Sequence, residues 1–596
     1  MSKQKNVARY YPGASSPCVS PAAKRRTLYP QALSNPPMSR RNVLKGSAAI
    51  SAIGLSGCGG SSGSITAVPN PGPVTVNPTP TPTLAGSGAH PIFGADSMTR
   101  QANVLSLRTE AATTQSSVNY GTQESNGDEG LYADYRASFT KGLPHDSLGE
   151  VDTSAFEGLL TALETGQTQD FESIPLGGTR KLVNPQGAYR YEMVGLDSHK
   201  TFINPAPAFE SLETAAEMGE LYWKALCRDV PFTEFGSNTL VQAAVADLNT
   251  FSEIVGPKSG GQVTSSTVFR GETPGDVTGP YISQFLLKDV PYGNGAIEQR
   301  YEAAAAGDDF MTDTASWLSV QNGTIPTPLS KGNARYISDG RALAEYVHLD
   351  YSYQAYLNAA LILLSFSNTV DVDNVYNSFV TQEGFTSLGG PDVLGMVAKA
   401  GNLALTGAWY QKWLVHRRAR PEVYGGRLHH QITGTKDYGL PSELVNSDAI
   451  AQTHANKGSY LLPMAYPEGS PTHPSYPAGH ACIAGACTTV LKAFFEESVQ
   501  IPAPVRPNAS GSALQSYNGS LTIGDELNKL ANNIALGRDW AGVHYRSDGI
   551  DGLKVGEQQA IGLLQDYSIT YREQFNGMTF TKFDGTVVTI SNGAVV

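Results

Sequence analysis

Apolar residues recur at steps of three and four residues through most of the chain beyond about residue 89, which is the period of a helix with one buried face. A clear case is the run through 209–226, where Ser211 is placed to cap the first turn. The same period predicts further helices, at residues 239–251, 299–317, 339–366, 390–418, 478–496 and 525–567. The last of them is expected to break near residues 540–552, where glycines crowd.

Only the C-terminal tail carries a β pattern. Residues 580–583 and 586–590 alternate apolar and polar side chains around Asp584-Gly585, a dipeptide typical of tight hairpin turns. The Gly- and Pro-rich stretches 424–477 and 497–520 are expected to be long loops, and loops of that length often carry function. The chain is therefore predicted to be mainly α, with helical bundles and a short C-terminal β-hairpin.

The composition narrows the class of protein. The chain has 596 residues, of which 40% are hydrophobic and 16% are charged, so it can bury a large core. No apolar run reaches the length of about 18 residues that a membrane-spanning helix needs. The formal net charge of −12 and the lack of a basic stripe argue against nucleic acid as a partner. Five cysteines are too few for a disulfide scaffold, and Cys482 and Cys487 are expected to be reduced core thiols.

The first 57 residues differ from the rest, because they contain nine Lys or Arg residues and no Asp or Glu. Within them, residues 39–45 resemble a twin-arginine export signal. A short apolar stretch follows and ends at Leu55-Ser56-Gly57-Cys58, which resembles a lipoprotein processing site. Residues 1–57 are therefore predicted to be a signal, with the true translation start at Met38 and a lipid on Cys58.

Residues 58–88 are rich in Gly, Ser, Pro and Thr, a composition typical of a tether. The folded domain, residues 89–596, would then be held at a membrane surface by the lipid, without a transmembrane helix. This predicts an exported protein that lies in the periplasm, at the outer membrane or on the cell surface. A disordered tail with chance arginines is the alternative.

Three segments hold an unusual set of charged residues. In the first, Lys412 and Arg420 lie eight residues apart at the end of a predicted helix, so they can point the same way if that helix continues. The second, 477–480 (Pro-Ala-Gly-His), opens an apolar helix whose backbone N–H groups and dipole favour an anion. The third, 537–548, contains an arginine, a histidine six residues later and an aspartate four residues beyond it.

Each segment alone has an ordinary explanation. The first is typical of a solvated helix face, and the second is typical of a turn. The third can be a helix C-terminus whose dipole pairs with the arginine, followed by a histidine in the core. Together, three cations, a helix N-terminus and two histidines suit one highly charged oxyanion, because burying such an ion requires several cationic hydrogen-bond donors.

The order and spacing of these motifs, Lys-x7-Arg-Pro, Pro-x-Gly-His and Arg-x5-His-x3-Asp, resemble the signature of the vanadium-dependent haloperoxidases and the type 2 phosphatidic-acid-phosphatase superfamily. Within it, the chain looks like a bacterial relative of the red-algal bromoperoxidases, which residues 279–285 and 470–477 also resemble. The resemblance covers about residues 89–570, with the active-site motifs in 409–548. It implies the helical-bundle fold shared by haloperoxidases and acid phosphatases.

The resemblance also implies a role for each motif residue. The groups that would bind the oxygens of vanadate are Lys412, Arg420, Arg538 and the Gly479 N–H. His544 would be the axial ligand to vanadium. His480 would be the acid–base group that helps deprotonate peroxide, and with Lys412 these two histidines would form the catalytic set.

Further residues would surround this set. Asp548 would fix the tautomer of the axial histidine. His473 matches a second histidine of the algal enzymes, and Trp409 matches an aromatic position near the halide, where red-algal enzymes tend to carry arginine. Two positions depart from the family pattern, since Ala478 and Gly537 stand where serine is usual. Neither departure removes a cation or a histidine. We therefore expect an altered vanadate affinity or halide preference, in a protein that is still a haloperoxidase.

The implied reaction is a vanadate-dependent haloperoxidation. Hydrogen peroxide oxidises a halide, expected to be bromide or iodide, to a hypohalous-acid equivalent. This product then halogenates a small organic acceptor. The same residues suit a phosphoryl-transfer transition state, so the alternative is an exported acid phosphatase with His544 as nucleophile and His480 as general acid. A non-catalytic oxyanion-binding lipoprotein would not need both histidines. Size, export, the lack of apolar spans and His473 favour the haloperoxidase.

Two weaker expectations follow from the resemblance. Asp371 and Asp373 follow a predicted long helix, near where red-algal relatives bind a structural calcium. Two carboxylates are too few for the roughly six to eight oxygen ligands of Ca²⁺, so backbone carbonyls would supply the rest. A solvated capping loop is an equal alternative. Relatives form dimers or dodecamers, so a homo-oligomer is also expected.

Overall fold

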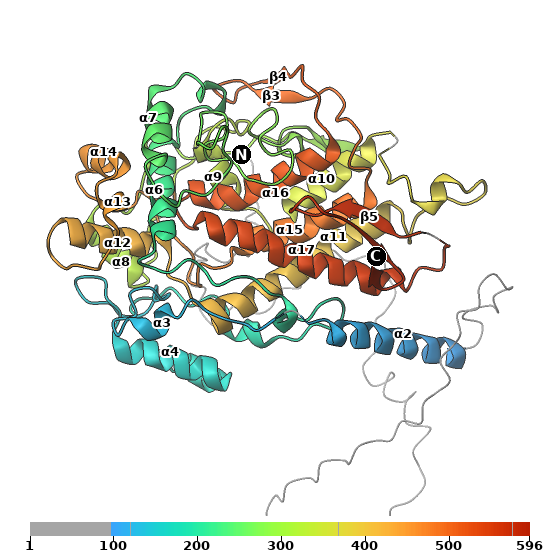
Figure 1. The fold of residues 1–596 in the computed structure, drawn as a ribbon, viewed down its shortest axis with the longest axis horizontal. Helices are drawn as coiled ribbons and strands as arrows, with labels where there is room; N and C mark the ends of the chain where they lie inside the picture. The colour runs from blue at the N-terminus through green and yellow to red at the C-terminus, as the bar shows by residue number, and fades with distance from the viewer. Residues whose placement is uncertain (1–96, 120, 368, 575) are drawn as a thin grey trace, which may run out of the picture. The chain divides into compact units, whose positions relative to one another are not determined.

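Four long helices lie at the centre of the folded chain in the computed structural model (Figure 1). They are α11 (Gly390–Tyr410), α15 (Gly479–Phe494), α16 (Ile523–Trp540) and α17 (Arg546–Ser568). The helix α15 packs against the other three, and all its residues except His480 are buried. The side chains of α15 are mostly apolar or small on every face, so this helix forms the core of the bundle. Cys482 and Cys487 on this helix are buried free thiols, as predicted.

Glycine at the crossing of α15 and α17 lets the two backbones approach closely. A Cβ atom on Gly485 would lie 2.1 Å from the Leu553 carbonyl oxygen, and one on Gly556 would lie 1.9 Å from the Cys482 carbonyl oxygen. Only glycine tolerates that spacing. The close crossing holds the N-terminus of α15 against the start of α17, where the second and third charged segments lie.

The structure describes residues 97–119, 121–367, 369–574 and 576–596. The predicted signal (1–57) and tether (58–88) lie outside these residues, so both stay predictions. Residues 101–596 belong to one compact unit. Among the described residues, no helix is long and apolar enough to cross a bilayer.

Shorter helices complete the described chain. The other α-helices are α2 (Ser97–Ser117), α3 (Asp128–Leu131), α4 (Thr153–Thr165), α5 (Thr168–Glu172), α6 (Leu212–Cys227), α7 (Thr239–Leu248), α8 (Thr314–Gln321), α9 (Gly340–Tyr346), α10 (Gln354–Ser365), α12 (Pro421–Ile432), α13 (Ser442–Val445) and α14 (Asp448–Lys457). Short 3-10 turns are η1 (Pro185–Tyr189), η2 (Ser198–Lys200), η3 (Phe232–Glu234), η4 (Gln284–Leu286) and η5 (Val375–Asn377). The predicted cap of α6 is confirmed, because Ser211 Oγ accepts a hydrogen bond from Thr214 N at 3.1 Å.

The helix predicted over 299–317 is wrong for most of its length. Only α8, at its C-terminal end, is helical. Before it the chain pairs with distant segments: Tyr301 exchanges backbone hydrogen bonds with Arg335, and Phe310 does so with Met464. These tertiary partners override the local helical preference of an alanine-rich stretch.

The helix predicted over 339–366 is split in two. The helix α9 ends at Tyr346 and α10 begins at Gln354, with a polar turn between them. This turn carries His348 and Asp350 into the cavity described below. The polar run that interrupts the helical pattern therefore forms part of the wall of this cavity.

The prediction of one long loop over 424–477 is also wrong, because α12, α13 and α14 lie in or across it. Pro421 begins α12, where its fixed φ and missing N–H cost nothing. A Cβ atom on Gly426 would lie 2.0 Å from the Trp317 ring, so the glycine allows α12 to pack against α8. Only the last part, after α14, is a long loop, and it forms one wall of the site.

The predicted C-terminal hairpin is confirmed. The strand β5 (Met578–Thr581) pairs antiparallel with β6 (Val587–Ser591), which pairs further with β7 (Ala594–Val595). Two small hairpins were not predicted: β1 (Val290–Tyr292) with β2 (Gly295–Ile297), and β3 (Val505–Pro507) with β4 (Leu514–Ser516). Strands of three residues are too short to show an alternating pattern.

Candidate active site

The first charged segment does not lie on one continuous helix, so that part of the prediction is wrong. After α11 the chain makes one π-helical turn, η6 (Gln411–His416), which carries Lys412. It leaves the helix at Arg417, whose φ of 44° is left-handed, and Arg420 is the N-cap of α12. Such π-turns are frequent at functional sites. Lys412 and Arg420 thus come from two elements, and both side chains are fully buried.

Both cations bind the loop that precedes α15. Lys412 Nζ donates hydrogen bonds to the carbonyl oxygens of Pro474 and Ser475, at 2.8 and 2.7 Å. Arg420 Nε donates to the His473 carbonyl oxygen at 2.9 Å. Burial, and then the neighbouring Arg420 charge, hold the pKa of Lys412 well below its ordinary value. The two charges repel each other in a low-dielectric region, which favours binding of an anion between them.

Arg420 also fixes the tautomer of His544. Its Nη1 lies 2.9 Å from His544 Nε2, and Nε2 must accept because a guanidinium only donates. The ring proton is then on Nδ1, which lies 2.8 Å from Asp548 Oδ2. Burial, and then the charges of the surrounding cations, hold the pKa of His544 well below its ordinary value, so the ring is neutral. An unprotonated ring nitrogen is the form in which histidine binds a metal.

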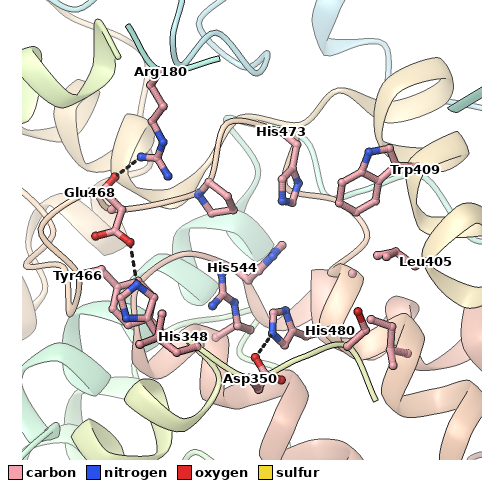
Figure 2. Close-up of a pocket in the computed structure, with 17 residues that line it drawn as sticks. Arg180, His348, Asp350, Leu405, Trp409, Tyr466, Glu468, His473, His480 and His544 are labelled. Atoms are coloured by element: carbon pink, nitrogen blue, oxygen red, sulfur yellow. Dashed lines mark hydrogen bonds and ion pairs between the residues drawn. The ribbon is translucent and has the colours of Figure 1, made fainter. Parts of the chain in front are cut away.

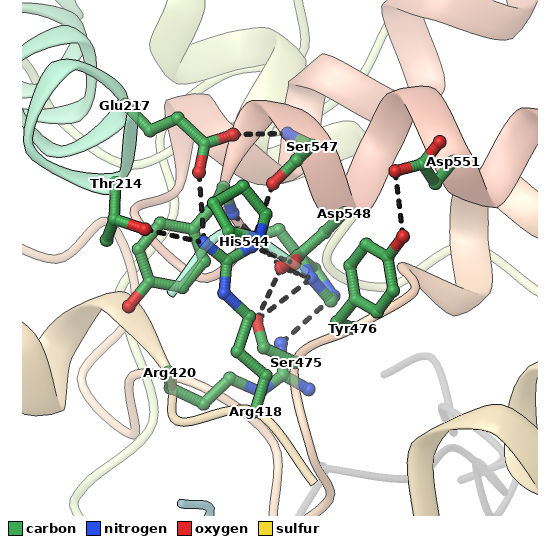
Figure 3. A network of polar contacts seen from close by, with 12 residues as sticks. Thr214, Glu217, Arg418, Arg420, Ser475, Tyr476, His544, Ser547, Asp548 and Asp551 are labelled. Atoms are coloured by element: carbon green, nitrogen blue, oxygen red, sulfur yellow. Dashed lines mark hydrogen bonds and ion pairs between the residues drawn. The ribbon is translucent and has the colours of Figure 1, made fainter. Parts of the chain in front are cut away.

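Asp548, at the start of α17, is held by donors on both carboxylate oxygens (Figure 3). Ser475 Oγ donates to Oδ2 at 2.5 Å, beside His544 Nδ1, and Arg418 Nη1 donates to Oδ1 at 2.9 Å. Arg418 Nη2 in turn donates to Glu217 Oε2 at 3.0 Å. Burial alone would lower the pKa of Arg418, but the carboxylates of Glu217 and Asp548 outweigh it and raise that pKa. This buried chain of alternating charged side chains keeps the Asp548 carboxylate oriented toward His544.

The second segment opens α15, as predicted. Gly479 is the first residue of the helix, and Ala478 is its N-cap without any side-chain hydrogen bond, so the helix N-terminus keeps free N–H groups. His480 Nε2 lies 3.0 Å from Asp350 Oδ1, on the turn between α9 and α10. The His480 side chain is 29% exposed, so it is open to the cavity while His544 is closed in.

Arg538 comes from the last turn of α16. Its Nη1 donates to the Val347 carbonyl oxygen at 2.7 Å, which ties the arginine to the end of α9. Its Nε is buried and has no hydrogen-bond partner among the described residues. A buried donor left unpaired costs about 1–3 kcal/mol, so an acceptor from outside the chain would be stabilised there.

One cavity is lined by part of this group (Figure 2). Lys412, Arg420 and Asp548 are buried behind it and are not among its lining residues. The predicted residues that line it are Trp409, His473, Gly479, His480, Arg538 and His544. It offers about 140 Å³ to the centres of water molecules, well above the roughly 10–15 Å³ that one water needs. The Trp409 and His473 rings lie 4.8 Å apart, centroid to centroid.

The donor set fits an oxyanion. We call Lys412, Arg420, Arg538 and the N-terminus of α15 the anion cage. Among the described residues, none of its three cations has a carboxylate oxygen within 4.0 Å. Three cations without contacting carboxylates, an unpaired guanidinium N–H and a helix N-terminus suit a tetrahedral oxyanion, and the unprotonated His544 Nε2 lies beside Arg420 of this cage.

Several residues of the site had no signal in the sequence. They are Arg180, Glu217, His348, Asp350, Arg418 and Glu468. His348 stacks on Tyr466 with centroids 3.7 Å apart, and its Nε2 lies 2.7 Å from Glu468 Oε1. Burial alone would lower the pKa of His348, but the carboxylates beside it raise that pKa. These residues reach the cavity from separate loops and helices, so no fixed spacing marks them.

Asp371 and Asp373 are not part of this cavity. Asp373 N donates to Asp371 Oδ1 at 2.8 Å, which is a local turn. Burial, together with nearby carboxylates, raises the pKa of Asp371 to about 6. Nowhere in the described part of the chain do three or more His, Cys, Asp or Glu residues gather so that they could hold a metal ion. Among the described residues, the predicted calcium site therefore gains no cluster with a third His, Cys, Asp or Glu ligand.

Comparison with known proteins agrees with this geometry. A family model described as the "VCPO second helical-bundle domain" matches residues 393–569, which include the anion cage and His544. The vanadium-dependent bromoperoxidase of Ascophyllum nodosum is 37% identical over 484 residues, which cover 76% of this chain and 86% of that protein. The enzyme of the same name from Corallina pilulifera is 34% identical, with 83% and 99% covered.

The fold is similar as well. The second vanadate-dependent bromoperoxidase of Ascophyllum nodosum, described as homohexameric, superposes with a TM-score of 0.80 at 32% identity. The match covers 86% of this chain and 94% of that one. Identity above 30% over more than two thirds of the length, a shared fold, and an anion cage beside a neutral histidine lead to one conclusion: the chain belongs to the family of vanadium-dependent bromoperoxidases.

Proposed function

We propose that this protein binds vanadate and uses hydrogen peroxide to oxidise bromide or iodide to a hypohalous-acid equivalent that halogenates small organic acceptors. The observation that carries this function is the neutral His544, whose unprotonated Nε2 lies beside the three buried cations of the anion cage. Among the residues that the structure describes, no carboxylate contacts these cations. The homology to bromoperoxidases supports the choice of bromide.

Lys412, Arg420, Arg538 and the Gly479 N–H would hold the oxygens of vanadate, and His544 would ligate the metal. Vanadate supplies an electrophilic centre that activates peroxide toward halide without changing its own oxidation state. Asp548 keeps the proton of His544 on Nδ1 and leaves Nε2 as the ligand. The cations draw negative charge away from the oxygens they bind.

His480 is proposed as the acid–base group. Asp350 engages its Nε2, so Nδ1 is the ring atom left to take up or return the proton of hydrogen peroxide. Trp409 and His473 line the side of the cavity where a halide would approach. His473 is neutral, because burial and then the Arg420 charge hold its pKa well below the ordinary value.

The test measures bromination of a phenolic dye with hydrogen peroxide, before and after orthovanadate is added to chelator-treated protein. We expect activity only after vanadate is restored. Hydrolysis of 4-nitrophenyl phosphate is measured in parallel, because the anion cage also suits phosphoryl transfer. Efficient phosphate-ester hydrolysis without vanadate, and no bromination with it, would establish the phosphatase instead.

The proposal includes export as a lipoprotein. It rests on the twin-arginine-like segment and on Cys58, both outside the described residues. N-terminal mass spectrometry of membrane-extracted protein should find a lipid on Cys58, and a mature protein that retains residues before Met38 would exclude this. A homo-oligomer is also proposed, in line with the homohexameric relative, and light scattering measures it.

Calcium is the remaining part of the proposal. Asp371 is buried beside other carboxylates, so a divalent cation would relieve their repulsion, with backbone carbonyls as further ligands. Removing calcium from the purified protein with a chelator is expected to lower the melting temperature by several degrees, while the Asp371→Asn variant should show no such response. A melting temperature that does not change with calcium excludes the site.

Ala478→Ser is expected to strengthen vanadate binding. A serine hydroxyl at this N-cap would add a donor beside the Gly479 N–H, and a hydrogen bond to a charged group contributes about 1.5–3 kcal/mol. Since a water molecule can already make part of this contribution, we expect half-saturation at about threefold to thirtyfold lower vanadate. Titration of the vanadate-free protein, followed by bromide oxidation, measures it. A higher melting temperature with unchanged half-saturation would mean that the hydroxyl caps α15 only.

Oxyanion binding is expected to be linked to proton uptake. Burial and Arg420 lower the pKa of Lys412 in the ligand-free protein, and a bound oxyanion favours the charged amine and raises that pKa. Affinity should therefore fall as the pH rises through the ligand-free pKa of Lys412. Calorimetry with vanadate in buffers of different ionisation enthalpy measures the uptake. Lys412→Arg, which stays charged, should lose this uptake, and an unchanged value in that variant would assign it to another group.

A further inference from the structure

A further cation, Arg180, faces the cavity outside the anion cage. It belongs to no sequence motif, yet its side chain lines the same cavity as Trp409, His473 and His480. Figure 2 shows it at the upper edge of the cavity, next to Glu468 and across from His480.

The backbone around Arg180 is held in place on both sides. Arg180 N donates to the Gly323 carbonyl oxygen at 3.0 Å. On the other side, Val183 N donates to the Thr472 carbonyl oxygen at 2.9 Å, and Thr472 Oγ1 donates to the Lys181 carbonyl oxygen at 2.5 Å. This segment therefore runs beside the loop that carries His473, and it presents the guanidinium from a preorganised position.

The charge of Arg180 is not matched by a contacting carboxylate in the described part of the chain. Its Nη1 donates to the backbone carbonyl oxygen of Glu468 at 3.1 Å. The carboxylates nearest to it already have partners: Glu468 Oε1 lies 2.7 Å from His348 Nε2, and Glu422 Oε1 lies 2.6 Å from Lys141 Nζ. Burial lowers the pKa of Arg180, as expected for a cation without a close counter-ion. An anion in the cavity would supply that partner.

Apolar side chains line the side of the cavity opposite Arg180, beyond His473 (Figure 2). Leu405 and Trp409 lie one turn apart on α11, and Ile483 lies one turn into α15. Trp409 Nε1 donates to the Val183 carbonyl oxygen at 3.3 Å, which joins this apolar wall to the Arg180 segment. The cavity offers about 140 Å³ to the centres of water molecules, close to the roughly 150 Å³ of an apolar cavity that holds a benzene ring.

We propose that Arg180 and the apolar wall bind the organic acceptor itself, and that they select an aromatic compound that carries an acidic group. The acid would pair with the guanidinium, and the ring would lie against Trp409 and its apolar neighbours. This inference rests on the haloperoxidase function proposed above. In the reaction, hypobromous acid transfers its bromine as Br⁺ to a ring carbon. The O–Br bond and one ring C–H bond break, a C–Br bond forms, and the released hydroxide and ring proton leave as water.

The test uses two phenols of similar size, 3-(4-hydroxyphenyl)propanoate and 4-propylphenol. Both compete for bromination by the vanadate-loaded enzyme, and both are titrated calorimetrically without peroxide. We expect the wild type to prefer the acid, because a hydrogen bond to a charged group is strong. Arg180→Gln should lower binding of the acid, and the acid-to-neutral bromination ratio, by about tenfold. The KM for bromide and the rate with 4-propylphenol should change less than about twofold.

Two variants keep the result specific. Lys181→Gln removes the same charge from the next residue, which is exposed and does not line the cavity, so it should behave like the wild type. Arg180→Lys should restore part of the preference. Equal bromination of both phenols by the wild type, or a raised KM for bromide in Arg180→Gln with an unchanged ratio, would overturn the proposal. If the loaded enzyme oxidises no halide, the proposed function fails, while calorimetry still decides whether Arg180 binds the acid.

Discussion

His544→Ala is expected to abolish vanadate binding and, with it, bromide oxidation. In the function proposed above, the imidazole Nε2 is the atom that ligates the metal, and without a ligand it accepts a hydrogen bond from Arg420 Nη1. Loss of a mere hydrogen-bond partner of a metal ligand costs about 10–100-fold in affinity, so loss of the ligand itself should cost more than about 100-fold. Equilibrium dialysis with vanadate measures the effect.

His480→Ala is expected to behave differently. His480 holds no position in the anion cage, and Asp350 engages its Nε2, so vanadate should bind within about tenfold of the wild type. Bromide oxidation should fall about 100-fold or more, because the proton acceptor for peroxide is lost.

His145→Ala is the control for both histidines. Burial lowers the pKa of His145 to about 4, so it is also a neutral histidine, but it lies outside the cavity. Its replacement should therefore change neither the vanadate affinity nor the rate of bromide oxidation. If His544→Ala binds vanadate like the wild type, the ligand assignment is wrong.

Asp548→Asn is expected to weaken vanadate binding by about 10–100-fold. An asparagine cannot carry the charge that stabilises the Nδ1–H of His544, and its amide N–H₂ would face Arg418 or Ser475, which donate to this site now. The altered hydrogen bonding would favour the other tautomer and bury an unpaired donor. Vanadate titration measures the affinity, and the ⁵¹V NMR shift of the bound anion reports the altered ligand.

Asp551→Asn provides the matched control on the same helix. Asp551 is buried one turn further along α17 and accepts from Tyr476 Oη at 2.7 Å, away from the histidine ligand. The Asp551→Asn variant should be less stable than the wild type, while the ⁵¹V NMR shift of its bound vanadate should stay unchanged. Equal vanadate affinities in the two variants would show that Asp548 acts through stability alone.

Much of the fold followed from periodicity. The four central helices and the C-terminal hairpin were predicted because their hydrophobic patterns are long and regular. The failures lie where the local helical preference met a stronger tertiary contact. Residues before Thr314 pair with distant segments through isolated bridges, and the polar turn at His348 splits a helix. The short β1–β2 and β3–β4 hairpins gave too few residues for any pattern.

By itself, the sequence determined which residues of the second and third charged segments lie close together, because Arg538, His544 and Asp548 lie within one short segment and Gly479 and His480 open one helix. Spacing along a regular element places such neighbours together in any fold. Only the tertiary structure decided that Lys412 and Arg420 meet through a π-turn and a chain reversal. It alone brought Asp350 to His480, Arg418 to Asp548 and Arg180 to the cavity. Those contacts join elements far apart in the chain, and they depend on how the helices pack.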